Sequence, residues 1–120
     1  MSGAQRYEGG CQCGAVRFRV NIDLEHTVIC NCSRCAKLGW IMAFTPAENF
    51  TLLGGGDDLT EYKFHREVIA HQFCRTCGIE PFARGTPPGA SAETVAINVR
   101  CLDGVDPAAL QPTMFDGKSR

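Results

Sequence analysis

Residues 30–37 have the sequence CNCSRCAK, which places three cysteines within six residues of chain. A disulfide would pair two of these thiols and leave the third one over. A sharp turn can instead bring all three sulfurs to one tetrahedral metal ion. A structural zinc site has four protein ligands, whereas a catalytic zinc site has three and keeps one position open. Because no obvious fourth ligand accompanies Cys30, Cys32 and Cys35, the stretch predicts an open zinc site around which the chain is organised.

Two alternatives for this stretch remain open. A ligand from elsewhere in the chain would close the site, and the candidates are Cys101, His26, His65 and His71. The three thiols would instead be redox-active if they held no metal. Arg34 and Lys37 lie in the same turn, where they would offset the negative charge of a three-thiolate zinc or hold an anionic substrate. Trp40 follows, either as a core residue or as a wall of a substrate pocket.

Two further cysteine pairs predict a second, closed metal site. Cys11 and Cys13 lie on the same side of an extended segment, since alternate side chains of a strand share a face. Residues 74–78, CRTCG, form a zinc knuckle, in which two thiols reach one metal through a tight turn and Gly78 supplies a positive φ. The two pairs together predict a four-thiolate structural zinc. Cys101 is left over, and a lone cysteine at a strand end is expected to be a small buried apolar residue.

The pattern of apolar residues predicts a mainly β fold of small antiparallel sheets with very little helix, in a single zinc-binding domain over residues 1–120. Eight short segments have the alternating or continuous apolar pattern of strands. They are residues 15–20, 27–30, 40–44, 50–53, 59–64, 68–73, 80–84 and 94–99. Pro81 predicts that the seventh of these begins at an edge or a bulge. Short helical turns are expected at 33–38, 46–49 and 106–110, the first capped by Ser33 and ended by Gly39.

The composition limits the classes of function. The chain has 120 residues, with 12 basic and 13 acidic side chains and no basic stripe, so binding of nucleic acid through phosphate neutralisation has no support. No apolar run approaches the roughly 18 residues of a membrane span, and the polar N-terminus lacks the apolar segment of a signal peptide. We therefore expect a cytoplasmic protein, in which eight cysteines indicate metal binding rather than disulfides.

The cysteine motifs, in this order and spacing, resemble those of the glutathione-dependent formaldehyde-activating enzyme family, also called the centromere protein V family. The segments that carry the resemblance are 10–16, 30–37, 73–79, 98–103 and 115–117. The resemblance implies an Mss4-like fold, in which β-sheets are built around zinc. It implies a structural zinc on Cys11, Cys13, Cys74 and Cys77, and a second, catalytic-type zinc on Cys30, Cys32 and Cys35.

The resemblance also implies an activity, the condensation of formaldehyde with glutathione to S-hydroxymethylglutathione by a carbon–sulfur lyase. On this hypothesis the second zinc polarises a carbonyl or binds the incoming thiol, while Arg34 and Lys37 attract the carboxylates of the thiol peptide. Candidates for the base that moves the proton are His71, His65 and Glu80. Glu80 stands where the family often has His. The alternative is a non-catalytic, zinc-stabilised module that binds a partner around Trp40.

Overall fold

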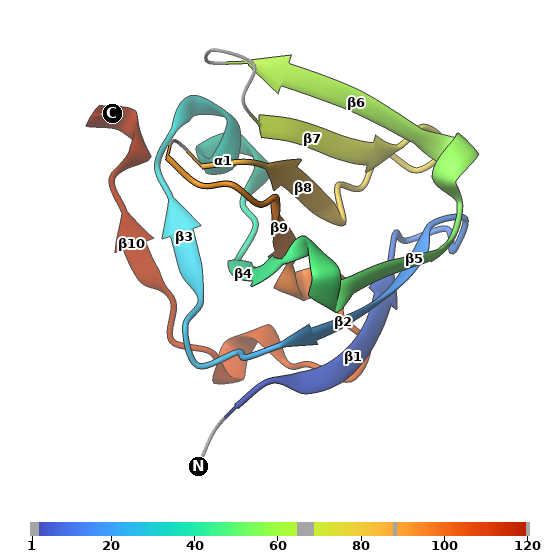
Figure 1. Cartoon of the computed structure of the whole chain (residues 1–120), viewed down its shortest axis with the longest axis horizontal. Coiled ribbons are helices and arrows are strands. Elements are labelled where there is room, and N and C mark those ends of the chain that lie inside the picture. The colour runs from blue at the N-terminus through green and yellow to red at the C-terminus, as the bar shows by residue number, and fades with distance from the viewer. Residues whose placement is uncertain (1–2, 65–68, 88, 120) are drawn as a thin grey trace.

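The computed structural model describes residues 3–64, 69–87 and 89–119, and this part of the chain forms ten strands in two sheets (Figure 1). The strands are β1 (Gln5–Gly10), β2 (Arg17–Ile22), β3 (Val28–Cys30), β4 (Met42–Pro46), β5 (Phe50–Gly54), β6 (Leu59–Phe64), β7 (Ile69–Cys74), β8 (Phe82–Gly85), β9 (Thr94–Asn98) and β10 (Thr113–Phe115). One sheet has the order β1-β2-β5, and the other has the order β10-β3-β4-β9-β8-β7-β6. The predicted mainly β class is confirmed, and the pairing is antiparallel except between β10 and β3, which are parallel.

Helical structure is scarce, as the sequence predicts. Over the described residues there is one α-helix, α1 (Ser33–Leu38), together with five 3₁₀ turns. These turns are η1 (Ala47–Asn49), η2 (Gly56–Asp58), η3 (Val99–Cys101), η4 (Pro107–Ala109) and η5 (Gly117–Ser119). No helix in the described ranges is long and apolar enough to cross a membrane.

The main core lies between the two sheets. Ala43, Ile97 and Phe82 face each other across β4, β9 and β8, and all three are almost fully buried. From the smaller sheet, Phe18 and Phe50 bring their rings to 5.9 Å and 4.8 Å from the Phe82 ring, in edge-on packing. Burial of each large apolar side chain contributes about 1.5–3 kcal/mol. This core fixes one face of the larger sheet, so the alternate side chains of β4, β8 and β9 point to the opposite face.

On that opposite face lies a smaller apolar cluster around Trp40, which is 3% exposed. Its buried members include Cys35 of α1, Met42 of β4 and Ala83 of β8. The predicted cap of α1 is wrong by one residue, because extended Cys32 is the N-cap and its sulfur accepts a hydrogen bond from the Cys35 N–H. Gly39 ends the helix in the left-handed conformation, as predicted.

Several strands begin one or two residues later than the sequence predicts. Residues 15 and 16 belong to a tight turn in which the Cys11 N–H donates a hydrogen bond to the Val16 carbonyl oxygen. Strand β2 therefore starts only at Arg17. Trp40 and Ile41 precede β4 as a connection. Pro81 likewise precedes β8, which is not an edge strand but lies between β7 and β9. The helical turn expected at 106–110 is the short 3₁₀ turn η4, with Asp106 as its N-cap.

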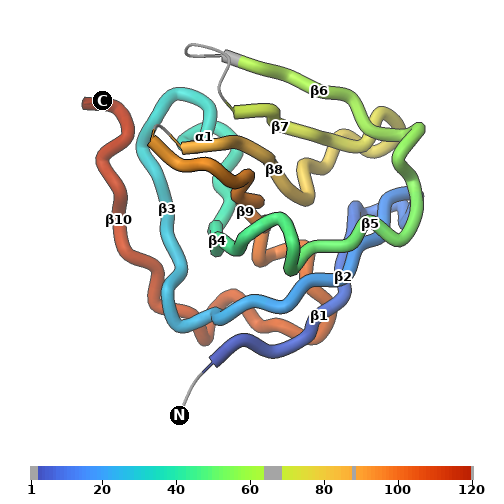
Figure 2. The backbone as a smooth tube through the Cα atoms, viewed as in Figure 1, coloured from blue at the N-terminus to red at the C-terminus, as the bar shows by residue number. Residues whose placement is uncertain are grey.

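Two strands were not predicted at all. The polar strand β1 pairs with β2 over six positions, from Gln5 opposite Ile22 to Gly10 opposite Arg17. The exposed strand β10 runs parallel to β3, so the C-terminal segment returns to the turn that carries the three clustered cysteines (Figure 2). Both strands are recognisable only through their partners, since neither has an apolar alternation of its own.

Candidate metal centre and active site

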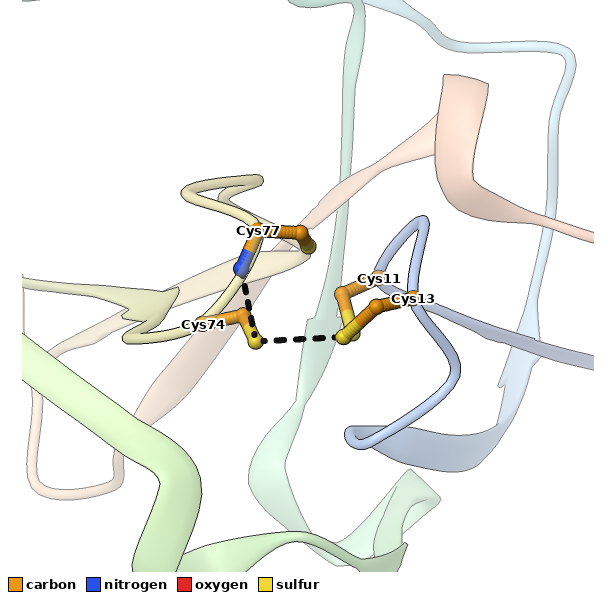
Figure 3. A group of neighbouring side chains, drawn as sticks. All are labelled: Cys11, Cys13, Cys74 and Cys77. Atoms are coloured by element: carbon orange, nitrogen blue, oxygen red, sulfur yellow. Dashed lines mark hydrogen bonds between the residues drawn. The ribbon is translucent and has the colours of Figure 1, made fainter.

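Four cysteines from distant parts of the sequence meet at one end of the core (Figure 3). Cys11 and Cys13 lie in the turn between β1 and β2, Cys74 ends β7, and Cys77 lies in the turn before β8. All four sulfurs lie within 4.8 Å of one another, with 3.6 Å between Cys11 and Cys13 and 3.7 Å between Cys13 and Cys74. Sulfurs placed about 2.3 Å from a tetrahedral zinc lie about 3.8 Å apart. The cluster therefore fits one ion with four thiolate ligands.

Backbone N–H groups favour the thiolate form of Cys74 and Cys77. At Cys13 the Ala15 N–H acts in the same direction, but burial and the neighbouring thiols raise the pKa to about 11. Cys74 accepts hydrogen bonds from the backbone of Thr76 at 3.4 Å and of Cys77 at 3.5 Å, and the Cys77 N–H lowers the pKa of Cys74. Burial acts to raise the pKa of Cys77, but the N–H groups of Ile79 and Cys13, with neighbouring thiols, lower it to about 6. Gly78 has φ +81°, the positive value that the knuckle turn requires. These are the conditions in which cysteine ligates a metal.

The three cysteines of the second cluster converge where β3 meets α1. Cys30 ends β3, Cys32 caps α1, and Cys35 lies within the helix, with their sulfurs within 4.8 Å of one another. Burial raises the pKa of Cys35 to about 12. Burial also acts to raise the pKa of Cys32, but the Cys35 N–H and further hydrogen bonds lower it. A cation at this point would hold both side chains in the thiolate form.

Among the described residues, no fourth Cys, His, Asp or Glu joins this cluster. Cys101 is half-buried in η3, outside both cysteine clusters, and burial raises its pKa to about 12. His26 is exposed and lies with Asp23 and Glu25, while His65 lies outside the described residues. His71 lines the same cavity as the three thiols without belonging to their group.

The C-terminal segment holds this cysteine turn in place, a role that sequence reasoning did not assign. The side chain of Asn31 donates to Asp116 at 3.0 Å and accepts from the Lys118 backbone at 2.9 Å. A Cβ atom at Gly117 would lie 2.6 Å from the Cys30 sulfur, which is closer than real contacts allow. Position 117 therefore needs glycine, because any side chain there would displace a candidate ligand.

A cavity of about 720 Å³ opens beside the three sulfurs. His71 and Trp40 line it, both almost fully buried, with their rings 6.1 Å apart. Trp40 is thus both a core residue and a cavity wall. A second hollow of about 560 Å³ lies next to α1 and is lined by Arg34, the exposed Lys37 and Tyr62.

Glu80 links the cavity to helix α1. Its side chain is 1% exposed, and its two carboxylate oxygens lie 2.6 Å from His71 Nδ1 and 2.6 Å from the guanidinium of Arg34. Arg34 also stacks on the ring of Tyr62 at 4.9 Å. A buried carboxylate needs such partners, and a carboxylate at Nδ1 fixes the orientation and tautomer of a histidine. The sequence named these three residues separately, and the structure joins them in the order Arg34, Glu80, His71.

The sequence profile described as glutathione-dependent formaldehyde-activating enzyme matches residues 6–116, a range that contains all eight cysteines. Among solved structures, a crystal structure of a Rhodobacter sphaeroides protein is similar with a TM-score of 0.80 and 32% sequence identity. The match covers 89% of this chain and 97% of that one. The chain therefore belongs to the glutathione-dependent formaldehyde-activating enzyme family.

Proposed function

We propose that the protein catalyses formation and cleavage of the carbon–sulfur bond between a small thiol, such as glutathione, and an aldehyde, with formaldehyde as the simplest case. The observation that carries the proposal is the three-cysteine cluster, which opens into a cavity also lined by His71. Membership of a family named for this reaction supports it. The reaction is the addition of a thiol to a carbonyl, which needs neither an oxidant nor a reductant.

The two clusters have different roles in this proposal. Cys11, Cys13, Cys74 and Cys77 would hold a structural zinc, because four thiolates complete its coordination. Cys30, Cys32 and Cys35 would hold a second zinc with a position open to the cavity. When bound, that ion supplies a Lewis acid and lowers the pKa of a thiol next to it.

The protein's own residues then position the reactants and move the proton. The thiol sulfur attacks the carbonyl carbon, its proton passes to the imidazole of His71, and the same proton is returned to the carbonyl oxygen of the adduct. Glu80 stabilises the imidazolium form that exists between these two transfers, and Arg34 pairs with the other carboxylate oxygen of Glu80. Lys118 at the cavity and Lys37 beside it would attract the carboxylates of a thiol peptide.

The test combines zinc content with turnover. Protein purified without chelator should contain two zinc ions per chain and lose one in a brief wash with a mild chelator, while its circular dichroism is unchanged. Exchange NMR of glutathione with formaldehyde should show acceleration by the two-zinc protein. We expect only the uncatalysed rate after the wash, and recovery when one equivalent of zinc is returned.

Two results would contradict the proposal. If both zinc ions resist the wash, the second site is closed by another ligand, and a zinc-stabilised binding module becomes the better description. If the washed one-zinc protein keeps its full rate, the three-cysteine cluster is not where the reaction occurs.

Replacing Glu80 by Gln should separate proton transfer from metal binding. The amide keeps the shape of the side chain but removes the charge that stabilises protonated His71, so we expect turnover to fall about 100-fold. The free energy of unfolding should fall by about 1–3 kcal/mol, because a buried charged hydrogen bond is weakened. Zinc content should stay at two. The measurements are exchange NMR, denaturant unfolding and metal analysis.

Glu61→Gln is the matched control for this substitution. Glu61 lies on β6 with its side chain 48% exposed, and its contact with Lys63 at 3.8 Å is a surface ion pair of little energetic weight. Turnover by the Glu80→Gln variant equal to that of the control would show that His71 does not act through Glu80.

A further inference from the structure

The floor of the cavity is set by the register of four strands. Phe44 of β4 pairs with Ala96 of β9, Ala96 pairs with Ala83 of β8, and Ala83 pairs with His71 of β7. Paired residues project to the same face of a sheet. The small side chains of the two alanines therefore lie between the larger side chains of a phenylalanine and a histidine. We call the resulting depression, from His71 to Phe44 along this row, the trough.

The trough is much larger than formaldehyde requires. A cavity of about 720 Å³ is in the range that takes a drug-sized ligand, roughly 300–1,000 Å³, whereas formaldehyde has a single carbon atom. Apart from the thiols and His71, its lining is dominated by apolar side chains, among them Trp40, Met42 and Ile69. The polar chain of a thiol peptide finds few partners on such walls: Lys118 is an exposed member of the lining, and Lys37 lies outside it.

We propose that this trough is a subsite for the apolar substituent of the aldehyde, so that the protein acts on aldehydes with an aromatic ring or a chain of several carbons. The carbonyl carbon would lie at the His71 end, where the ring of Trp40 lies 6.1 Å from that of His71 and packs in one cluster with Cys35. The substituent would lie over Ala83 and Ala96 toward Phe44. Each methylene buried there should raise affinity about fourfold. The inference rests on the proposed function for the reaction, but the binding of an apolar group can be measured without it.

The kinetic test compares linear aldehydes of different length, among which the three alkyl aldehydes have similar reactivity. With the intact two-zinc protein and glutathione, we would measure the rate enhancement over the uncatalysed reaction for formaldehyde, ethanal, butanal and hexanal. The enhancement should rise at least tenfold from ethanal to hexanal. A rate enhancement that stays constant or falls as the aldehyde chain lengthens would overturn the inference while leaving the proposed function in place.

A second measurement follows binding alone. Trp40 is the only tryptophan of the chain and lines the cavity, so its fluorescence reports on occupation of the trough. Ethanol and 1-hexanol carry the same chains as two of the aldehydes but cannot form an adduct with a thiol. We expect saturable quenching or a spectral shift with 1-hexanol at concentrations at which ethanol has no effect.

The variant Ala96→Leu fills the trough from its floor. It should lower the ratio of the hexanal to the ethanal enhancement at least tenfold and abolish the response to 1-hexanol. The control is Thr94→Leu, two residues earlier on the same face of β9 and paired with Gly85, outside the lining of the cavity. This control should keep both the ratio and the fluorescence response.

The outcomes separate the two proposals. Binding of 1-hexanol that Ala96→Leu abolishes, without turnover of any aldehyde, supports the apolar subsite and overturns the proposed reaction. Turnover of formaldehyde without binding of 1-hexanol overturns the subsite. An equal fall in the hexanal-to-ethanal enhancement ratio in Ala96→Leu and Thr94→Leu also overturns the subsite. The effect would then come from a change in strand β9 and not from filling the trough. A stable dimer in sedimentation with no binding of 1-hexanol would show that a second copy covers the trough, which contradicts the subsite.

Discussion

A Cys74→Ser variant should fail to fold at neutral pH. Cys74 is fully buried, and its sulfur lies 3.7 Å from that of Cys13, between the two segments that the four-cysteine cluster joins. A structural zinc contributes on the order of 10 kcal/mol or more to folding, while the net stability of a domain is only about 5–15 kcal/mol. A serine hydroxyl does not replace the thiolate, so the variant should lose most of its stability.

The measurement is far-UV circular dichroism with thermal unfolding and zinc analysis, on freshly purified soluble protein. We expect no cooperative unfolding transition and less than one zinc per chain. Cys101→Ser is the control, because Cys101 is half-buried and belongs to neither cluster. Its melting temperature should stay within a few degrees of the native value, in keeping with a change of about 1 kcal/mol. A Cys74→Ser variant that melts cooperatively would show that the core holds the fold without this metal site.

The two cysteine clusters show which features of this protein can be predicted from its sequence. Spacing of two or three residues fixes where thiols can point, so each cysteine motif can be recognised locally, as can the left-handed glycines at positions 39 and 78. Each cysteine pair alone leaves a metal incompletely coordinated, so residues 11–13 are expected to meet residues 74–77. Local geometry and ligand counting therefore predicted both clusters.

The features that depend on register could not be predicted in this way. Glu80 meets His71 because the Cys74 N–H bonds to the Ile79 carbonyl oxygen and so returns the chain to the end of β7. Arg34 reaches Glu80 from α1, which packs Cys35 into one cluster with Ala83 of β8. Neither the order of the strands nor the position of α1 is encoded in a single segment. The trough likewise exists because Ala83 and Ala96 are neighbours across strands, although they are 13 positions apart in the chain.

The cap of α1 illustrates a competition that the sequence leaves open. Serine is the better intrinsic N-cap, yet Cys32 takes that position and Ser33 becomes the first helical residue. Placing Cys32 outside the helix lets its sulfur meet those of Cys30 and Cys35 and accept the Cys35 N–H at the same time. The requirements of the three-thiol cluster thus determine where the helix begins.

This double role of Cys32 makes Cys32→Ser the sharpest test of the second site. The serine hydroxyl can cap α1 as the cysteine sulfur does, so the helix and the packing of Trp40 should persist. The three-cysteine cluster, however, falls to two thiolates, which are too few to retain zinc against a mild chelator. We expect one zinc per chain, a melting temperature within a few degrees of the native value, and turnover reduced to the uncatalysed rate.

Ser33→Ala is the matched control, since it changes the adjacent exposed side chain without removing a thiol. It should keep two zinc ions and more than half of the native turnover. A folded Cys32→Ser protein with one zinc and native turnover would rule out catalysis at the three-cysteine cluster. A folded variant that still holds two zinc ions would show that another ligand completes the site. Loss of folding in Cys74→Ser, set against loss of turnover alone in Cys32→Ser, would assign stability to one cluster and chemistry to the other.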